Sequence, residues 1–399
     1  MSRSRPDKRK RRPATILGRA GRNPHAHRGA VNPPVFHAST ILFRDTADLR
    51  TRGPNRLDDV VYGRFGTPTT FAFEEAMAAA EGGARSVAVG SGKTAVAVAL
   101  SSFLAAGDHL LMVDSAYGPT RSMANGWLAR FGVETTFYDP CIGAGIAALI
   151  RDNTRVVFLE SPGSHTFEVQ DVPGIAAAAH ANDCTVILDN TWASPLFFRP
   201  FEHGVDVSIQ AATKYVSGHS DAMLGAVTTT EETHVVVRKT AQALGATVGP
   251  DDLYLGLRGL RTLDVRLRRH MESGLALARW LADRPEVERV LHPGLEGDPG
   301  HALWRRDFLG ASGLFGMVLR PAPPAAYDAF LDGLELFGMG YSWGGFESLI
   351  VPSTLRGARD VAPWPAPERT FRIHAGLEDV ADLQDDLETG FAQLESRTG

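Results

Sequence analysis

Between about residues 85 and 245, short β-branched or aliphatic runs alternate with longer alanine-rich segments. This alternation is typical of a mostly parallel sheet wrapped by helices, in which each helix returns the chain to the start of the next strand. Residues 156–159 and 185–188 are almost continuously apolar, as in strands that are covered on both faces. We therefore expect an α/β domain whose functional groups lie at the carboxyl ends of its strands.

The same pattern predicts the individual elements. Strands are expected at 85–89, 109–113, 133–138, 155–159, 184–188, 206–210 and 223–229. Helices are expected at 92–106, 119–131, 143–151, 171–182 and 231–245. From residue 260 onward, a basic amphipathic helix, strands near 313–319 and 369–374 and a closing helix near 379–394 predict a smaller α+β domain.

The flanking segments divide the chain further. Residues 1–12 contain seven basic side chains and one acidic one, and are expected to form a disordered basic tail. Residues 13–64 are rich in Pro, Gly, Asn and Arg and lack apolar periodicity, which indicates an extended arm lying on another surface such as a partner subunit. The large domain is then expected at 65–259 and the small domain at 260–399.

Composition narrows the classes of function. No apolar run approaches the roughly 20 residues that span a bilayer, and the first apolar stretch lacks a signal-peptide layout. A cytoplasmic protein with no membrane partner is therefore expected. Two cysteines, Cys141 and Cys184, are too few for a thiolate zinc site, and we expect no metal. Beyond the basic tail the chain is acidic and has no basic stripe with interleaved aromatics, so no nucleic-acid partner is expected.

A glycine-rich segment, Gly-Ser-Gly-Lys-Thr at 90–94, follows one predicted strand and begins a predicted helix. The phosphate loop of nucleotide hydrolases needs another glycine five residues before Gly92, where this chain has Val87. A nucleotide hydrolase remains an alternative that would require magnesium and a triphosphate at Gly92. A phosphate monoester also suits this position, because free N–H groups and the helix dipole favour an anion there.

Two more polar residues follow predicted strands. Asp189 ends one of them, where it either caps the next segment or serves a ligand. Lys214 follows another, in a chain where only five of 41 basic residues are lysine. A lysine desolvated among small residues has a lowered pKa and becomes a nucleophile. A phosphate anchor, a carboxylate for a pyridine nitrogen and an amine for a Schiff base are what pyridoxal phosphate requires, so the sequence predicts this cofactor.

Six motifs resemble those of the Cys/Met-metabolism pyridoxal-phosphate enzymes: residues 62–67, 160–164, 188–193, 210–215, 341–348 and 372–378. The resemblance runs from about residue 14 to the C-terminus and is greatest to the bacterial cystathionine β-lyase branch. It implies an aspartate-aminotransferase-like fold (fold type I) with a large and a small domain. It also implies a homo-oligomer that is at least a dimer with shared active sites. The expected assembly is a tetramer formed from two such dimers.

The resemblance implies a role for each matched residue on the cofactor side. Lys214 would carry the cofactor and move a proton, Asp189 would pair with the pyridinium nitrogen, and Tyr117 would stack on the ring. The phosphate would be bound by Gly92, Lys93 and Thr213 and, from the neighbouring subunit, by Tyr62 and Arg64.

On the substrate side, Arg372 would hold the α-carboxylate in a bidentate pair and Ser342 would position the Lys214 amine. Tyr341 and Trp343 are expected in the same substrate-binding segment. The residues expected to act in catalysis are Lys214, Tyr117, Tyr62 and Ser342.

Two departures from the family pattern concern phosphate binding. Many relatives carry a serine three residues before the lysine, where this chain has Ala211. They also have a small or apolar residue where this chain has Lys93, whose ammonium either replaces the lost contact or points to solvent.

The implied reaction is carbon–sulfur cleavage of an amino-acid substrate. Cystathionine or a related S-substituted cysteine would undergo β-elimination to a thiol such as homocysteine, pyruvate and ammonia. The alternative within the family is γ-elimination or γ-replacement, as in cystathionine γ-lyase, γ-synthase or sulfhydrylases, which needs a further proton abstraction at Cβ.

Overall fold

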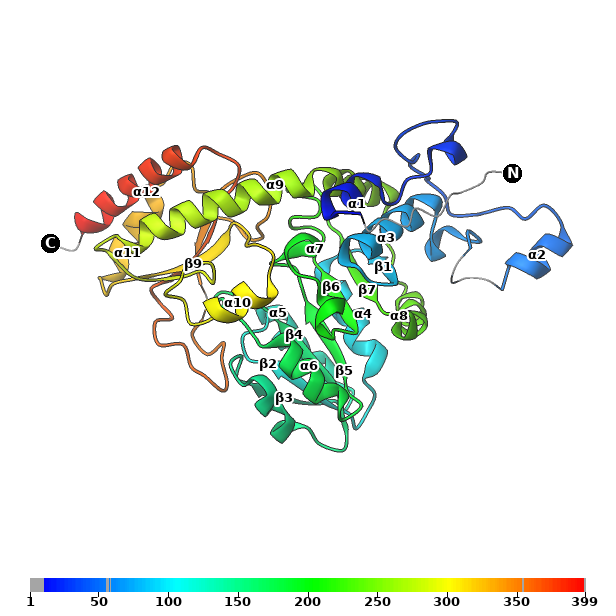
Figure 1. Cartoon of the computed structure of the whole chain (residues 1–399), viewed down its shortest axis with the longest axis horizontal. Helices are drawn as coiled ribbons and strands as arrows, with labels where there is room; N and C mark the ends of the chain where they lie inside the picture. Colours follow the sequence, from blue (N-terminus) through cyan, green and yellow to red (C-terminus); the bar gives the residue numbers. More distant parts are fainter. Residues whose placement is uncertain (1–10, 55–56, 58, 354, 398–399) are drawn as a thin grey trace.

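The computed structural model describes residues 11–54, 57, 59–353 and 355–397. A large part built on a seven-stranded sheet and a smaller part built on a four-stranded sheet lie side by side (Figure 1). The long helix α9 (Pro250–Ala282) runs from one part to the other. Most of the predicted basic tail, residues 1–10, lies outside the described residues.

The large sheet has the strand order β1-β7-β6-β5-β4-β2-β3. The strands β3, β2, β4, β5 and β6 pair in parallel, whereas β7 runs antiparallel to its neighbours β6 and β1. This confirms the prediction of a mostly parallel sheet. The strands are β1 (Arg85–Val89), β2 (His109–Val113), β3 (Glu134–Tyr138), β4 (Thr154–Glu160), β5 (Thr185–Asp189), β6 (Val207–Gln210) and β7 (Gly225–Thr229).

Helices cover both faces of this sheet, and its strands lie in one large apolar core. They are α3 (Pro68–Glu81), α4 (Gly92–Phe103), α5 (Gly118–Ser122), α6 (Val172–His180), α7 (Ser194–Phe197) and α8 (Glu231–Ala243), with a 3-10 turn at Pro200–His203.

Two predicted helices differ in type. The segment predicted as one helix at 119–131 is the short α5 followed by a π-helical stretch, Met123–Leu128. The segment predicted at 143–151 is a 3-10 helix, Gly143–Leu149. Its two glycines explain the difference, because Gly143 takes a φ of 53° and glycine lowers α-helix stability.

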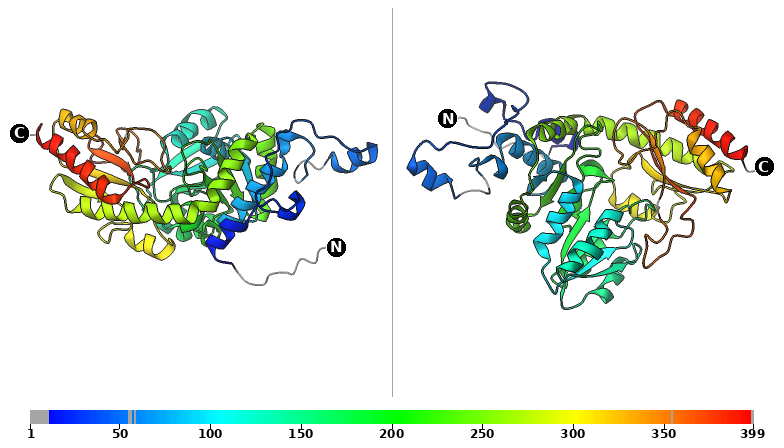
Figure 2. Two further views of the ribbon diagram at one scale, coloured as in Figure 1. Left: turned by 90° about the horizontal axis from the view of Figure 1, so that it is seen from above. Right: turned by 180° about the vertical axis from the view of Figure 1, so that it is seen from behind.

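The predicted arm contains more regular structure than expected: α1 (Pro13–Arg19), α2 (Thr46–Arg52) and 3-10 turns at Pro24–His27 and Gly63–Phe65. α1 packs on α3 and α9 of its own chain through Leu17, which is 4% exposed. Arg261 on α9 donates to the carbonyl oxygens of Leu17 and Ala20 at 2.7 and 2.8 Å. By contrast, the loop that carries α2 projects away from the body of the chain (Figure 2).

The smaller part contains an antiparallel sheet of order β10-β11-β9-β8 with its own apolar core around Phe315, Phe330 and Phe371. Its strands are β8 (Val287–Leu291), β9 (Leu314–Leu319), β10 (Leu349–Pro352) and β11 (Thr370–His374), and its helices are α10 (His301–Asp307), α11 (Pro324–Asp332) and α12 (Val380–Glu395). The prediction missed β8, β10, α10 and α11. It also started the long helix at 260, although Pro250 and two aspartates begin it earlier.

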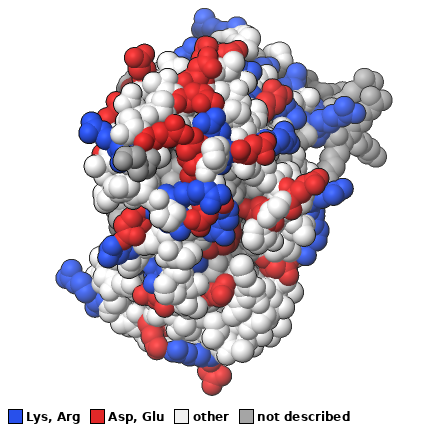
Figure 3. All heavy atoms as spheres, turned by 90° about the vertical axis from the view of Figure 1, so that its left-hand side faces the viewer, with Lys and Arg blue, Asp and Glu red and all other residues white. Residues whose placement is uncertain are grey.

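Charge on the molecular surface is mixed where Figure 3 shows it, on the side that faces left in Figure 1. Acidic and basic side chains are interspersed over this face, with no continuous basic stripe on it. Within the part of the chain that the structure describes, no helix has both the length and the apolar character needed to cross a bilayer.

Candidate active site

The carboxyl ends of three parallel strands bring the candidate residues together. Glu160 ends β4, Asp189 ends β5, and these two residues are direct register partners. Lys214 follows β6, which pairs with β5 on its other side. The site therefore lies at the sheet edge where the sequence places it.

Lys214 has a buried amine directed at the smaller part of the chain. Its Nζ donates to Ser342 Oγ at 2.6 Å and lies 5.3 Å from the centre of the Trp343 ring. Burial lowers the pKa of Lys214 to about 8, the positive charge of Arg372 adds to this shift, and Asp189 opposes it. A larger share of the amine is thus unprotonated near neutral pH than in a free lysine.

The backbone of residues 342–344 closely approaches the Lys214 turn. Ser342 has a φ of 77°, in the left-handed region that few non-glycine residues adopt. Gly344 has a φ of 90°, and a Cβ atom there would lie 2.9 Å from Tyr215 N and 3.0 Å from Lys214 C. Only glycine fits at this contact, so Gly344 allows Ser342 to reach the amine.

Asp189 is held by one carboxylate oxygen. Thr191 donates to Asp189 Oδ1 through its backbone N at 3.0 Å and its hydroxyl at 2.5 Å. The same hydroxyl accepts from Ala211 N at 2.9 Å. Burial raises the pKa of Asp189, while the Thr191 bonds and Lys214 lower it. Neither Thr191 bond uses Oδ2, which leaves that oxygen for a cationic partner.

Tyr117 and Glu160 lie beside this pair. Tyr117 N donates to Glu160 Oε2 at 2.7 Å. Burial and the nearby Asp189 raise the pKa of Glu160 well above its usual value. Burial and the charges of Glu160 and Asp189 also raise the pKa of the Tyr117 phenol, and Arg372 opposes the shift. The Tyr117 side chain thus lies within electrostatic range of the carboxylates Glu160 and Asp189 and of the Arg372 guanidinium.

At the predicted phosphate end, Gly92 packs closely against the turn before Lys214. A Cβ atom on Gly92 would lie 2.5 Å from Ala211 Cβ. Ser91 caps α4 by accepting from Thr94 N at 3.1 Å. The Thr213 hydroxyl accepts from Leu224 N at 2.9 Å and donates to Leu224 O at 3.2 Å, so it bonds its own chain in this structure.

The position of Lys93 leaves both expectations for it as predictions. Lys93 is exposed, its ammonium donates to the carbonyl oxygen of Pro119, and partial desolvation lowers its pKa. The side chain lies in a cavity of about 560 Å³ that is lined mainly by apolar residues, among them Met123, Trp127 and Leu244. Lys93 therefore contacts the start of α5 while it stays exposed to solvent.

On the substrate side, Arg372 extends from β11 and donates through Nη2 to Ser342 O at 3.0 Å. Burial lowers its pKa. Trp343 packs against Tyr215 with ring centres 5.4 Å apart, whereas Tyr341 is 96% exposed. Arg372, Ser342 and Lys214 thus form one connected group, and Tyr341 lies outside it.

The two arm residues make different contacts. Tyr62 is 42% exposed and packs edge to face on Phe65. Arg64 lies over the Phe65 ring and donates to Gln242 O on α8 at 2.9 Å. These contacts do not include Lys214, Asp189 or Arg372 of the same chain.

Known proteins are similar to this chain over almost its whole length. A model of the Cys/Met metabolism PLP-dependent enzyme family matches residues 14–392. The chain belongs to this family. It is 50% identical over 382 residues to a putative cystathionine beta-lyase of Rhizobium johnstonii, with 95% of each chain covered. It is 44% identical to cystathionine beta-lyase MetC of Escherichia coli, covering 95% of this chain and 98% of that one.

A solved structure supports the same conclusion. The crystal structure of metB from Corynebacterium glutamicum has a TM-score of 0.90 and 30% identity, covering 96% of this chain and 98% of that chain. The predicted fold is thereby confirmed, and membership of a PLP-dependent family identifies pyridoxal phosphate as the cofactor.

The residues of this PLP-family site fit the cofactor chemically. Asp189 and Glu160 are two partly buried carboxylates whose pKa values are raised by desolvation, and a cationic ring nitrogen would offset the cost of desolvating their charge. The Lys214 amine has a lowered pKa, as a carbonyl nucleophile requires.

Sequence reasoning gave no role to three residues that the structure places at this family site. Glu160 occurs in a quoted motif, and its position at the end of a strand next to Asp189 was the available signal. Thr191 follows Asp189 by two residues, a spacing typical of an Asx-type hydrogen bond. His165 has a pKa lowered to about 4 by burial and by Arg372, a proximity that no local pattern indicates.

Proposed function

We propose that the protein is a pyridoxal-phosphate-dependent C–S lyase that cleaves cystathionine, or a related S-substituted cysteine, by β-elimination. The observation that carries this proposal is the part-buried Lys214 amine, which is bonded to Ser342 and is within electrostatic range of both Asp189 and Arg372. The relatives of 44 to 50% identity named cystathionine beta-lyase support the choice of substrate.

The chain's own residues would bind the substrate and move one proton. Arg372 would bind the α-carboxylate through its planar guanidinium, and Ser342, which accepts a hydrogen bond from Lys214 Nζ, would position this amine to remove the Cα proton. The bound cofactor supplies the electron sink for the pair left at Cα. Departure of the β-thiolate and hydrolysis then yield homocysteine, pyruvate and ammonia. Asp189, held by Thr191, would pair with the ring nitrogen of the cofactor.

γ-Replacement is the competing activity, since a cystathionine gamma-synthase of Mycobacterium bovis is 36% identical to this chain. That reaction requires a second proton transfer at Cβ. The hydrogen bond from Lys214 Nζ to Ser342 Oγ would restrain the amine against the further movement that a transfer at Cβ needs. Supplied with cysteine and an activated ester of homoserine, the protein should form no cystathionine above the uncatalysed level. Formation of cystathionine as the faster reaction would contradict the proposal.

We also propose that the protein is a homo-oligomer. It would be at least a dimer, and two dimers would form a tetramer. Arg64 and Tyr62 lie on the arm, away from the Lys214 group of their own chain, and the projecting loop with α2 needs a surface to cover it. Tyr62 and Arg64 would then reach the phosphate of a neighbour's cofactor. The proposed compartment is the cytoplasm, where the free thiols of Cys141 and Cys184 stay reduced.

Arg372→Lys should raise the KM for cystathionine about thirtyfold, which corresponds to roughly 2 kcal/mol for a lost charge-assisted hydrogen bond. Lysine keeps the charge but loses the fork. The absorbance of the bound cofactor should not change. Arg369→Lys is the control and should keep the wild-type KM, because Arg369 directly precedes β11 and is paired with Glu288. Loss of cofactor from Arg372→Lys, with normal activity per bound cofactor, would contradict the role.

The rate at which the apoprotein takes up pyridoxal phosphate should rise with pH, with a midpoint near the Lys214 pKa of about 8. Only the unprotonated amine attacks the aldehyde, and the ordinary pKa of 10.5 would give a much later rise. Stopped-flow absorbance between about pH 6.5 and about pH 10 measures this rate. Arg372→Gln removes a positive neighbour, so the midpoint should move up. A midpoint close to 10.5 in the wild type would contradict the assignment.

A further inference from the structure

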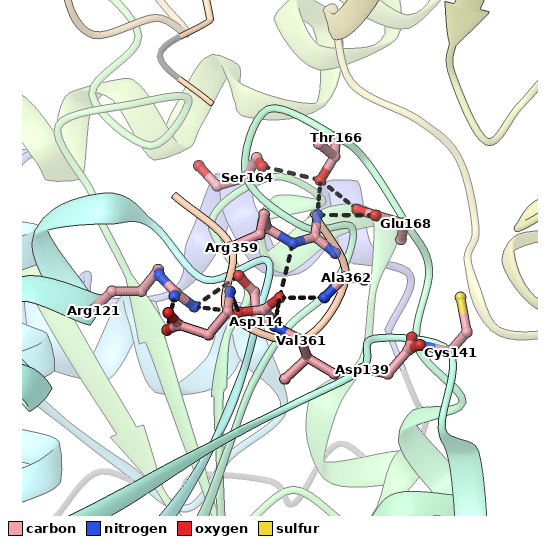
Figure 4. A network of polar contacts seen from close by, with 11 residues as sticks. Asp114, Arg121, Asp139, Cys141, Ser164, Thr166, Glu168, Arg359, Val361 and Ala362 are labelled. Carbon is pink, nitrogen blue, oxygen red and sulfur yellow. Dashed lines mark hydrogen bonds and ion pairs between the residues drawn. The ribbon is translucent and has the colours of Figure 1, made fainter. Parts of the chain in front are cut away.

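Asp114 is a fully buried carboxylate that reaches across the two parts of the molecule. It follows the last residue of β2 and is 0% exposed. Its Oδ1 accepts from Asp360 N at 2.9 Å, and its Oδ2 accepts from Val361 N at 3.0 Å and Ala362 N at 3.1 Å. These three consecutive N–H groups belong to the segment between β10 and β11 of the smaller part (Figure 4).

Two arginines complete the contact. Arg121 donates through Nη1 to Asp114 Oδ1 at 2.8 Å and through Nη2 to Asp360 Oδ2 at 2.6 Å. Arg359 donates through Nε to Asp114 Oδ2 at 3.2 Å and through Nη1 to Glu168 Oε1 at 3.0 Å. We call these five residues the Asp114 network. Burial alone would raise the pKa of Asp114, but the backbone hydrogen bonds and Arg121 outweigh it and keep the pKa below its usual value.

Each segment that the network joins also carries a residue of the candidate active site. Tyr117 lies between Asp114 and Arg121 in the chain. His165 is three residues before Glu168 and bonds Ser353 at 3.0 Å. The segment at 359–362 is followed, after residues 363–369, by β11, which carries Arg372. The network is therefore placed to set the distance between the turn that carries Tyr117 and the strand that carries Arg372.

A second buried ion pair shows what a purely structural pair looks like in this chain. Glu74 on α3 pairs with Arg238 on α8, with Arg238 Nη1 2.9 Å from Glu74 Oε1. Glu74 also accepts from Ala88 N on β1 at 2.9 Å. Both side chains are buried, as are those of Asp114, Arg121 and Arg359, but they join elements of the large part alone.

We propose that Asp114 is a positioning residue for substrate binding: it docks residues 359–362 of the smaller part on the Tyr117 turn and so sets where Arg372 lies relative to Lys214. The docking rests on the contacts above, and its effect on substrate rests on the proposed function. Without the carboxylate, three N–H groups and two guanidinium groups lose a buried acceptor, and the segment should separate from β2.

Asp114→Ala should raise the amide hydrogen exchange rate at 360–362 at least about tenfold. It should also weaken the binding of L-alanine, read from the bound cofactor's absorbance, by about tenfold, and raise the KM for cystathionine by a similar factor with kcat within about threefold. Glu74→Ala is the matched control. It should lower the melting temperature about as much as Asp114→Ala does. It should leave L-alanine binding and the amide exchange at 360–362 unchanged.

Arg359→Gln decides the matter if Asp114→Ala does not fold, because it removes one side chain of the network and leaves the three N–H bonds. It should move exchange, L-alanine binding and KM in the same direction by a smaller factor. Unchanged L-alanine binding and KM in these variants, or an equal change in Glu74→Ala, would overturn the proposal. If the wild type cleaves no cystathionine, the proposed function fails, while exchange and L-alanine binding still decide the role of Asp114.

Discussion

Lys214→Ala is expected to lower turnover by at least about a thousandfold and to abolish covalent attachment of the cofactor. Two functions would be lost together: the amine that bonds the cofactor and the base that moves the Cα proton. Ser342 would lose its 2.6 Å partner, but the fold should remain, because an alanine side chain leaves the backbone bonds of this turn, from Ala211 to Gly218, in place. Absorbance of the bound cofactor and the rate of thiol release measure the two losses.

Lys93→Ala is the matched control, since Lys93 is the other lysine near the site. Its ammonium bonds Pro119 O, so its removal should leave covalent attachment intact and weaken cofactor retention at most slightly. Borohydride reduction followed by peptide mapping locates the attached lysine. A pyridoxyl group on Lys93 or Lys239 would show that the assignment is wrong.

Mixing two inactive variants should restore activity if the site is shared between subunits. Arg64→Ala and Lys214→Ala homodimers are each expected to be nearly inactive. Refolded together in equal amounts, about half of the dimers would be mixed, and each mixed dimer would hold one site with both residues intact. Activity should therefore return to about a quarter of the wild-type value.

The pair Asp189→Ala and Lys214→Ala is the control for that experiment. Both residues lie at neighbouring strand ends of one chain, so every site in their mixed dimers has a defect and activity should not return. Native mass spectrometry verifies that the hybrids form. If hybrids of Arg64→Ala and Lys214→Ala form but stay inactive, Arg64 acts within its own chain and the shared-site proposal fails.

The large sheet was predictable because its strands are buried on both faces and therefore read as short apolar runs. β2 and β7 are buried at every position. β8 escaped prediction because exposed Glu288 and Arg289 interrupt its apolar residues, and β10 because it has only four residues, is partly buried and ends in a proline. The start of α9 was missed because its first turn contains Pro and Asp, which do not contribute to the apolar periodicity that marks a helix.

The candidate site was predictable as far as it depends on strand ends and motifs. Asp189 and Lys214 follow strands, and the geometry brings them to one edge with Arg372 and Ser342. The direction of Lys93 depends on Pro119, and the Asp114 network depends on contacts across about 245 residues of chain. Contacts of this kind depend on the packed fold, and local sequence patterns do not contain them.

The most direct test of the proposed lyase is to identify the keto acid that the purified protein forms from cystathionine. Pyruvate with homocysteine is the expected product pair, because one proton transfer at Cα by Lys214 leads to departure of the β-thiolate. 2-Oxobutyrate with cysteine would place the cleavage at the γ-carbon and contradict the account.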